Sequence, residues 1–130
     1  MSIGRSEARP AALRALRGAT TAEANEADSI VEATAELLRE MLRRNEVVPD
    51  DVVSMIFTST SDLDAEFPAS AARKIGMSHV PVLCAREIDV PGAVARCIRV
   101  LMHLQTGREP GALKHVYLAD ASQLRTDLPE

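Results

Sequence analysis

One segment of the chain has the pattern of a long amphipathic helix, and the segments around it resemble strands. In "SIVEATAELLREMLRRN", residues 29–45, apolar side chains recur near the helical period of 3.6 residues and charged side chains fill the opposite side. Asn25 is a candidate N-cap for this helix, and Glu40 can pair with Arg43 or Arg44. A single helix covers only one face of a sheet, which restricts the folds open to the chain.

The remaining apolar segments have strand character. Residues 97–106 are compatible with a helix or a strand, but the alternation of Ile98, Val100, Met102 and Leu104 with their neighbours favours a strand. Gly18 is expected to end the first strand, which would place Arg17 at a strand end. The expected strands are 13–21, 51–63, 79–88, 97–106 and 113–121, with one or two helical turns within 68–76. A polar loop is expected at 58–69, which overlaps the end of the second strand.

These elements predict an α/β (α+β) fold, with a five-stranded mixed sheet, one long helix and a short helical turn. Residues 1–11 are interpreted as a flexible N-terminal extension and residues 12–130 as a single domain. The helix leaves one sheet face bare, and a bare apolar face must be buried. Association with identical chains is the economical way to bury it.

Composition narrows the class of partner. The net charge of −4 argues against nucleic acid, which usually leaves a basic footprint on its partners. Because no secretory signal or membrane-spanning pattern is visible, we expect a cytoplasmic protein that is not bound to a membrane. Cys84 and Cys97 form neither a CxxC nor a zinc pattern, so they are expected to be reduced and mostly buried thiols.

Arginine far outnumbers lysine in the chain, which has Lys74 and Lys114 as its two lysines. The nucleotide composition of the genome is one explanation. Recognition of carboxylates is another, because the planar guanidinium group matches a carboxylate through two parallel hydrogen bonds. The two explanations are compatible.

Charged residues interrupt the most apolar long segment, residues 80–106. Arg99 and Glu87 stand out, because they lie among side chains that otherwise resemble a core. They can pair with each other or with Arg86 and Asp89, or they can point into a ligand pocket. The residue types alone leave both interpretations open.

Five short stretches, taken in order, resemble one family. They are "RGATT" (17–21), "FPA" (67–69), "VPVLCAREIDVPG" (80–92), "CIRVLMHLQT" (97–106) and "HVYLADASQLRTDL" (115–128). From about residue 13 to 128 the chain resembles the monofunctional chorismate mutases of the trimeric α/β class. The resemblance implies a homotrimeric pseudo α/β-barrel with active sites between subunits. It also implies a Claisen rearrangement of chorismate to prephenate, in the biosynthesis of phenylalanine and tyrosine, without metal or cofactor.

The resemblance further implies roles for individual residues. Arg99 would face the ether oxygen of chorismate, and Glu87 with Cys84 would face the ring and its hydroxyl group. Arg17 and Tyr117 would bind the enolpyruvyl carboxylate. The pocket would be completed by Phe67, Ala69, Arg73, Val82 and Leu83 of a neighbouring subunit, and Leu124 and Arg125 would close over it.

Two other functions fit a small trimeric fold of this kind. One is an enamine/imine deaminase on a similar trimeric barrel, whose own motifs are not apparent in the chain. The other is a non-catalytic trimeric module that binds a small carboxylate and regulates a partner. Glu87 argues against the second, because a simple dicarboxylate-binding site gains nothing from an anion.

Overall fold

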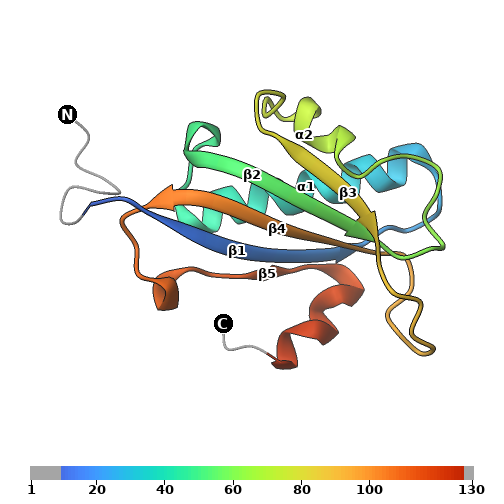
Figure 1. Cartoon of the computed structure of the whole chain (residues 1–130). Coiled ribbons are helices and arrows are strands. Elements are labelled where there is room, and N and C mark those ends of the chain that lie inside the picture. The colour runs from blue at the N-terminus through green and yellow to red at the C-terminus, as the bar shows by residue number, and fades with distance from the viewer. Residues whose placement is uncertain (1–9, 128–130) are drawn as a thin grey trace.

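The structure, a computed structural model, describes residues 10–127, so most of the predicted N-terminal extension (1–11) lies outside the described residues. The predicted order of strands and helices is confirmed (Figure 1). The elements are β1 (Ala12–Thr21), α1 (Ala27–Asn45), η1 (Pro49–Asp51), β2 (Val52–Ser59), α2 (Ser70–Lys74), β3 (Val82–Arg86), β4 (Cys97–Thr106), η2 (Pro110–Ala112), β5 (Val116–Tyr117) and η3 (Ala119–Asp127), where η denotes a 3₁₀ helix.

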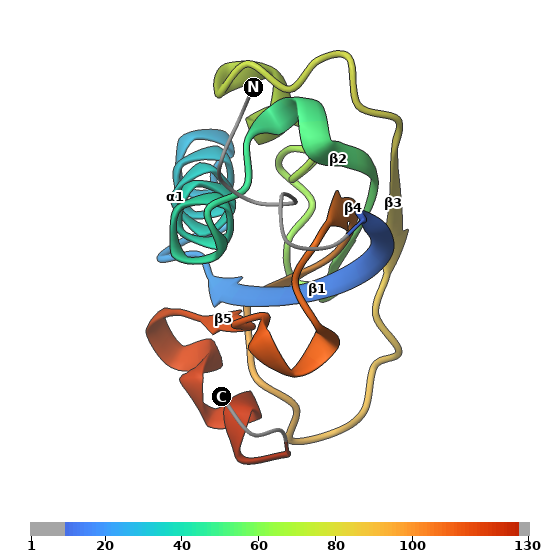
Figure 2. The same ribbon diagram turned by 90° about the vertical axis from the view of Figure 1, so that its left-hand side faces the viewer.

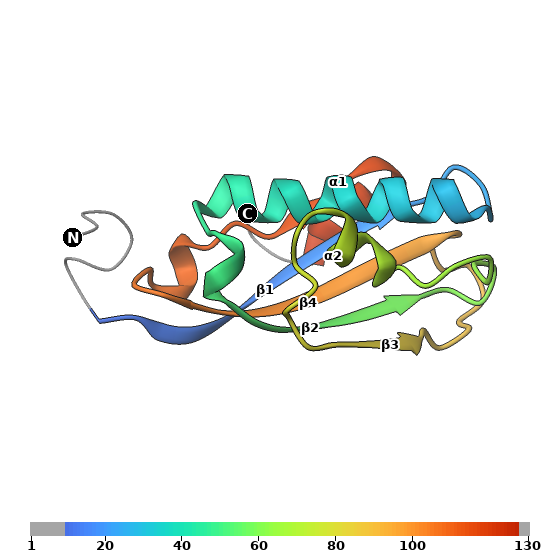
Figure 3. The same ribbon diagram turned by 90° about the horizontal axis from the view of Figure 1, so that it is seen from above.

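The five strands form one mixed sheet in the order β3-β2-β4-β1-β5. Strand β4 runs antiparallel to β1 and β2, whereas β2–β3 and β1–β5 are parallel pairs. Helices α1 and α2 lie on the same side of this sheet (Figures 2 and 3). The predicted α+β fold class is therefore confirmed, including the sheet face that α1 does not cover.

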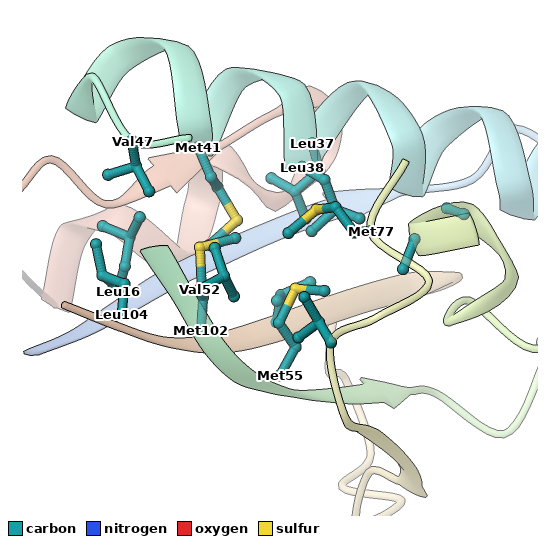
Figure 4. Close-up of a cluster of buried hydrophobic side chains, with 14 of the residues drawn as sticks. Leu16, Leu37, Leu38, Met41, Val47, Val52, Met55, Met77, Met102 and Leu104 are labelled. Carbon is teal, nitrogen blue, oxygen red and sulfur yellow. The ribbon is translucent and has the colours of Figure 1, made fainter. Parts of the chain in front are cut away.

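The main core lies between α1 and the sheet, and sulfur-containing side chains fill much of it. Four methionines are fully or almost fully buried there: Met41 of α1, Met55 of β2, Met102 of β4, and Met77 from the segment between α2 and β3 (Figure 4). Methionine is unbranched and adapts to irregular gaps. Phe57 is the one fully buried aromatic side chain of the described residues, so flexible side chains supply the volume that a chain with 2% aromatic residues otherwise lacks.

Strand β1 continues past Gly18, so the prediction that this glycine ends the strand is wrong. Gly18 pairs with Val100 of β4 on one side and with Val116 of β5 on the other. A Cβ atom at this position would lie 2.4 Å from Met41 Sδ. The glycine therefore lets α1 approach the strand closely, and Arg17 lies within β1 and not at its end.

Asn25 does not cap α1, so this prediction is also wrong. The N-cap is Glu26, which makes no side-chain capping bond. The Asn25 Oδ1 atom accepts hydrogen bonds from the backbone amides of Asp64 (2.9 Å) and Ala65 (3.0 Å), and its Nδ2 donates to Asp64 Oδ1 (2.7 Å). Asn25 thus holds the loop that leads to Phe67.

The last strand is shorter than the sequence pattern predicts. Only Val116 and Tyr117 pair with β1, although the pattern extends over residues 113–121. The backbone of Ala119 has a left-handed φ of 53°, which turns the chain out of the strand and into η3. Ala121 of η3 then packs against Ala19 and Cys97, so η3 covers this end of the outer sheet face.

The rest of the outer face is open in the single chain. Ile56 of β2 pairs with Leu83 of β3 and with Leu101 of β4, which places three apolar side chains in one row. Leu83 is 67% exposed and Ile56 37%, and all five residues of β3 are exposed. Other large exposed apolar side chains are Leu13, Val48, Val53, Phe67, Val82, Ile88 and Val90.

Candidate active site

One row of residues crosses all five strands on the outer face. Strand register pairs Ala85 of β3 with Thr58 of β2, Thr58 with Arg99 of β4, Arg99 with Ala19 of β1, and Ala19 with Tyr117 of β5. Directly paired residues project to the same face of a sheet. Arg99 therefore projects away from the core because of its position in β4, between the buried residues Ile98 and Val100.

A cavity of about 300 Å³ lies over one end of this row. Arg17, Arg99 and Tyr117 line it, and Leu124 of η3 forms part of its wall. Arg17 comes from the adjacent row, where it pairs with Leu101. Two guanidinium groups and a phenol in one cavity form a site suited to a small anion with a carboxylate group.

Glu87 lies beside Arg99, held by contacts at the end of β2. Its backbone amide donates to Ser59 O at 2.9 Å, and its carboxylate accepts a hydrogen bond from the Thr58 hydroxyl group. The Glu87 Oε2 atom is 3.5 Å from Arg99 Nε. The side chains of Arg99 and Glu87 are 49% and 25% exposed. The sequence left open whether these residues pair with each other or face a ligand, and in the structure they lie side by side while both remain accessible to a ligand.

The two cysteines differ in environment. Cys97 is buried, as expected, two residues before Arg99 on the same face of β4, and burial raises the pKa of its thiol, an effect that Arg99 opposes. Cys84 of β3 is exposed, so the expectation that both thiols are buried is wrong for this residue. Cys84 pairs with the buried Phe57 and so lies on the helix-facing side of the sheet, but β3 is an edge strand whose five residues are all exposed.

Cys84 lines a second cavity, of about 400 Å³, at the β3 edge of the sheet. Phe67 and Pro68 line it from the loop that Asn25 holds, and Arg86 also contributes to its wall. This cavity shares no lining residue with the one around Arg17 and Arg99. Within one chain, the residues expected to form the site therefore fall into two groups. One group lies at the β3 edge of the sheet, and the other lies over β4, β1 and β5.

Among the other expected residues, Leu124 lines the first cavity, whereas Ala69, Arg73, Val82 and Leu83 line neither cavity. Ala69 is the N-cap of α2 and packs against the main core, and Arg73 is exposed in the same helix. Val82 and Leu83 are exposed on β3. Leu124 lies over the first cavity in η3, the segment to which Arg125 also belongs.

The sequence pattern did not predict two sets of contacts at the site, those of Thr58 and those of Asn25. Thr58, which bonds Glu87, lies where the expected strand (51–63) and the expected polar loop (58–69) overlap, and the pattern predicts no partner for it. Its alternation with Ile56 was the signal that could have placed it on the outer face. For the bonds that Asn25 makes to residues 64 and 65 no sequence signal exists, because they join segments far apart in the chain.

No group of three or more His, Cys, Asp or Glu residues with the geometry of a metal site occurs within residues 10–127. Within the same range, no helix has the length and apolar character needed to cross a membrane.

The fold and the site together describe an α+β protein with a cavity suited to a small carboxylate anion on the outer face of its sheet. The sequence model of the family "Chorismate mutase type I" matches residues 13–128. "Chorismate mutase AroH" of Bacillus subtilis (strain 168) is 43% identical over 117 residues, which cover 89% of this chain and 92% of that protein. The protein of the same name from Thermus thermophilus is 46% identical over 117 residues, covering 89% of this chain and 96% of its own.

A solved structure agrees. A chorismate mutase from Clostridium thermocellum has a TM-score of 0.82 and 50% identity with this chain, and the match covers 84% of this chain and 97% of the other. The chain belongs to the type I chorismate mutases. It is thus an isomerase of aromatic amino acid biosynthesis, which converts chorismate to prephenate, and neither the deaminase nor the regulatory module describes it.

Proposed function

We propose that Arg99 is the residue that stabilises the transition state of the rearrangement. In this step the ether C–O bond of chorismate breaks while a C–C bond forms, and no proton is exchanged. Negative charge develops on the ether oxygen, which is neutral in the ground state. A fixed guanidinium group beside that oxygen therefore acts mainly on the transition state. The observation that supports this role is the open cavity in which Arg99 lies with Arg17 and Tyr117.

Glu87 and Arg17 have complementary roles in this proposal. The ring gains positive charge as the ether bond breaks, and the carboxylate of Glu87 next to Arg99 supplies a negative group to face it. Arg17 and Tyr117 bind the enolpyruvyl carboxylate. Together these contacts hold the substrate in a compact conformation close to the reactive geometry.

A second copy of the chain completes the site in this proposal. Cys84 and Phe67 line a cavity that is separate from the one around Arg99. In a homotrimer the β3 edge of one subunit would lie over the Arg99 cavity of the next, so that Phe67, Ala69, Arg73, Val82, Leu83 and Cys84 close the pocket from the other side. The exposed apolar row of Ile56 and Leu83 supports this assembly.

A cytoplasmic location stays a prediction of the sequence, which cell fractionation would test.

Replacement of Arg99 tests the proposal directly. Deletion of one preorganised donor typically costs on the order of 10²–10³ in rate, so Arg99→Ala should lower kcat at least that much and change KM less. Arg99→Lys should recover part of the rate, because it keeps the charge and loses the planar geometry. The measurement is the loss of chorismate absorbance, with prephenate identified as the product.

Arg43→Ala is the matched control, because Arg43 is an exposed arginine at the end of α1. It should keep kcat within a few fold of wild type. Near-wild-type kcat in Arg99→Ala, with the fold and assembly unchanged, would remove Arg99 from the mechanism.

A further inference from the structure

We propose that Thr58 is a positioning residue for the rearrangement, which acts by holding the carboxylate of Glu87 away from full contact with Arg99. This inference rests on the proposed function, because it assigns work to Thr58 only if Glu87 and Arg99 act on chorismate. Thr58 itself need not contact the substrate.

The geometry around Glu87 supports the proposal. A single oxygen, Oε2, accepts the hydrogen bond of the Thr58 hydroxyl group and also faces Arg99 Nε at 3.5 Å. Charge-assisted hydrogen bonds between a guanidinium group and a carboxylate usually have lengths of about 2.7–2.9 Å. The carboxylate of Glu87 is thus bonded to the hydroxyl group of Thr58 and stays short of closing on Arg99.

Register explains why Thr58 is the residue that does this. Thr58 pairs directly with Arg99 across β2 and β4, and the backbone of Glu87 is bonded to Ser59, the next residue of β2. The Thr58 hydroxyl group therefore lies on the outer face next to both charged groups. A hydroxyl group has one donor hydrogen, and in this position it is directed at Glu87.

The arrangement matters for the chemistry. A closed ion pair would occupy donors of Arg99 and would neutralise charge that the transition state needs on both partners. With the carboxylate anchored on Thr58, Arg99 keeps donors for the ether oxygen, and Glu87 Oε1 remains available to the ring side of the substrate. Preorganised charges of this kind are effective because they need no rearrangement during the reaction.

Thr58→Val removes the hydroxyl group and keeps the shape of the side chain. Loss of a hydrogen bond to a charged group typically costs about 1.5–3 kcal/mol, which corresponds to roughly 10- to 150-fold in rate. We expect kcat to fall by about 10-fold or more while KM changes less than threefold, and Thr58→Ser to retain most of the rate. Thr58→Ala provides a second variant without the hydroxyl group. Thr34→Val, at a buried threonine of α1 whose hydroxyl group bonds Ile30 O, is the matched control and should keep wild-type kcat.

A double-mutant cycle with Glu87→Gln separates positioning from a general structural effect. If Thr58 acts through Glu87, Thr58→Val should lower kcat in the wild-type background and have little further effect in Glu87→Gln. An equal loss in both backgrounds, or kcat within twofold of wild type in both hydroxyl-free variants, would overturn the inference while leaving the roles of Glu87 and Arg99 intact. If Glu87→Gln and Arg99→Ala both keep wild-type kcat, the proposed function of the site fails first.

Discussion

At the scale of single residues, position 18 has room for glycine only, because side chains of α1 pack directly against its backbone. A Cβ atom there would lie 2.4 Å from Met41 Sδ and 3.1 Å from Leu37 Cδ1. Met41 is flexible and can move, so we expect the cost of Gly18→Ala at the lower end of the roughly 1–3 kcal/mol typical of overpacked cores. Urea unfolding would show this as a lower midpoint.

Gly111→Ala is the control for that substitution. A Cβ atom at Gly111 would meet nothing within 4 Å, so the replacement should leave stability unchanged or raise it by restricting the unfolded chain. An equal loss of stability in both variants would contradict the packing explanation for Gly18.

Single residues also show where sequence reasoning works. Arg99 and Glu87 attracted attention because charged groups in an apolar segment need a reason, and both line or adjoin the cavity. The sequence did not indicate a role for Thr58, because threonine is common in strands. Only the register of the folded strands shows that Thr58 lies next to Arg99 and Glu87. Asn25 drew the wrong interpretation, because an asparagine before a helix is typical of an N-cap and its true partners lie about 40 residues away.

At the scale of elements, periodicity predicted α1 and β4 well. The helical pattern starts two residues after the observed start of α1, and the bounds of β4 match the predicted 97–106. Strand β5 was overestimated, because an apolar run does not reveal the left-handed φ of Ala119 that ends it. Local pattern thus predicts the elements that bury one continuous face, and it fails where the end of an element depends on tertiary contacts.

The charged end of α1 provides a prediction about pH. Arg43 and Arg44 donate hydrogen bonds to Glu40, which lowers the pKa of its carboxyl group from the usual 4.5 to about 2. A lowered pKa in the folded state stabilises the fold above about pH 4.5, and this contribution disappears as the pH falls toward 2. Glu40→Gln should therefore lower Tm slightly at pH 7, and the difference from wild type should shrink below pH 4.5.

Thermal unfolding followed by circular dichroism at pH 7, 5 and 3 measures this difference. Glu36→Gln, on the exposed side of the same helix, is the matched control and should show a smaller difference at neutral pH. A gap between Glu40→Gln and wild type that stays constant down to pH 3 would contradict the assignment to these ion pairs.

At the scale of the whole molecule, the sheet with one bare face predicts assembly. The apolar side chains of Ile56 and Leu83 on the outer face leave water only if another chain covers them. We expect a homotrimer, detectable by sedimentation equilibrium or native mass spectrometry. Ile56→Asp should dissociate it and reduce activity, since each site would lose the part supplied by its neighbour. Ala27→Asp, at the exposed start of α1, should leave both assembly and activity unchanged, and a wild-type monomer at micromolar concentration would refute the shared site.

The bare face itself followed from counting elements, because one long helix cannot cover both sides of five strands. The division of the site residues into two cavities within one chain did not follow from the sequence. That division depends on the order of strands in the sheet, which places β3 at one edge and β5 at the other.

The sheet fixes the distances between residues of the site that lie in one row across its strands. This row consists of Ala85, Thr58, Arg99, Ala19 and Tyr117. Neighbouring strands lie about 4.8 Å apart, so the backbone ladder, and not the loops, sets the spacing between Thr58, Arg99 and Tyr117. One extra residue inserted early in β4 would turn Arg99 toward the core and bring a neighbour to the surface in its place. The connections between strands do not set the spacing within this row, so a change in their length can leave Thr58, Arg99 and Tyr117 aligned, whereas a change within a strand cannot.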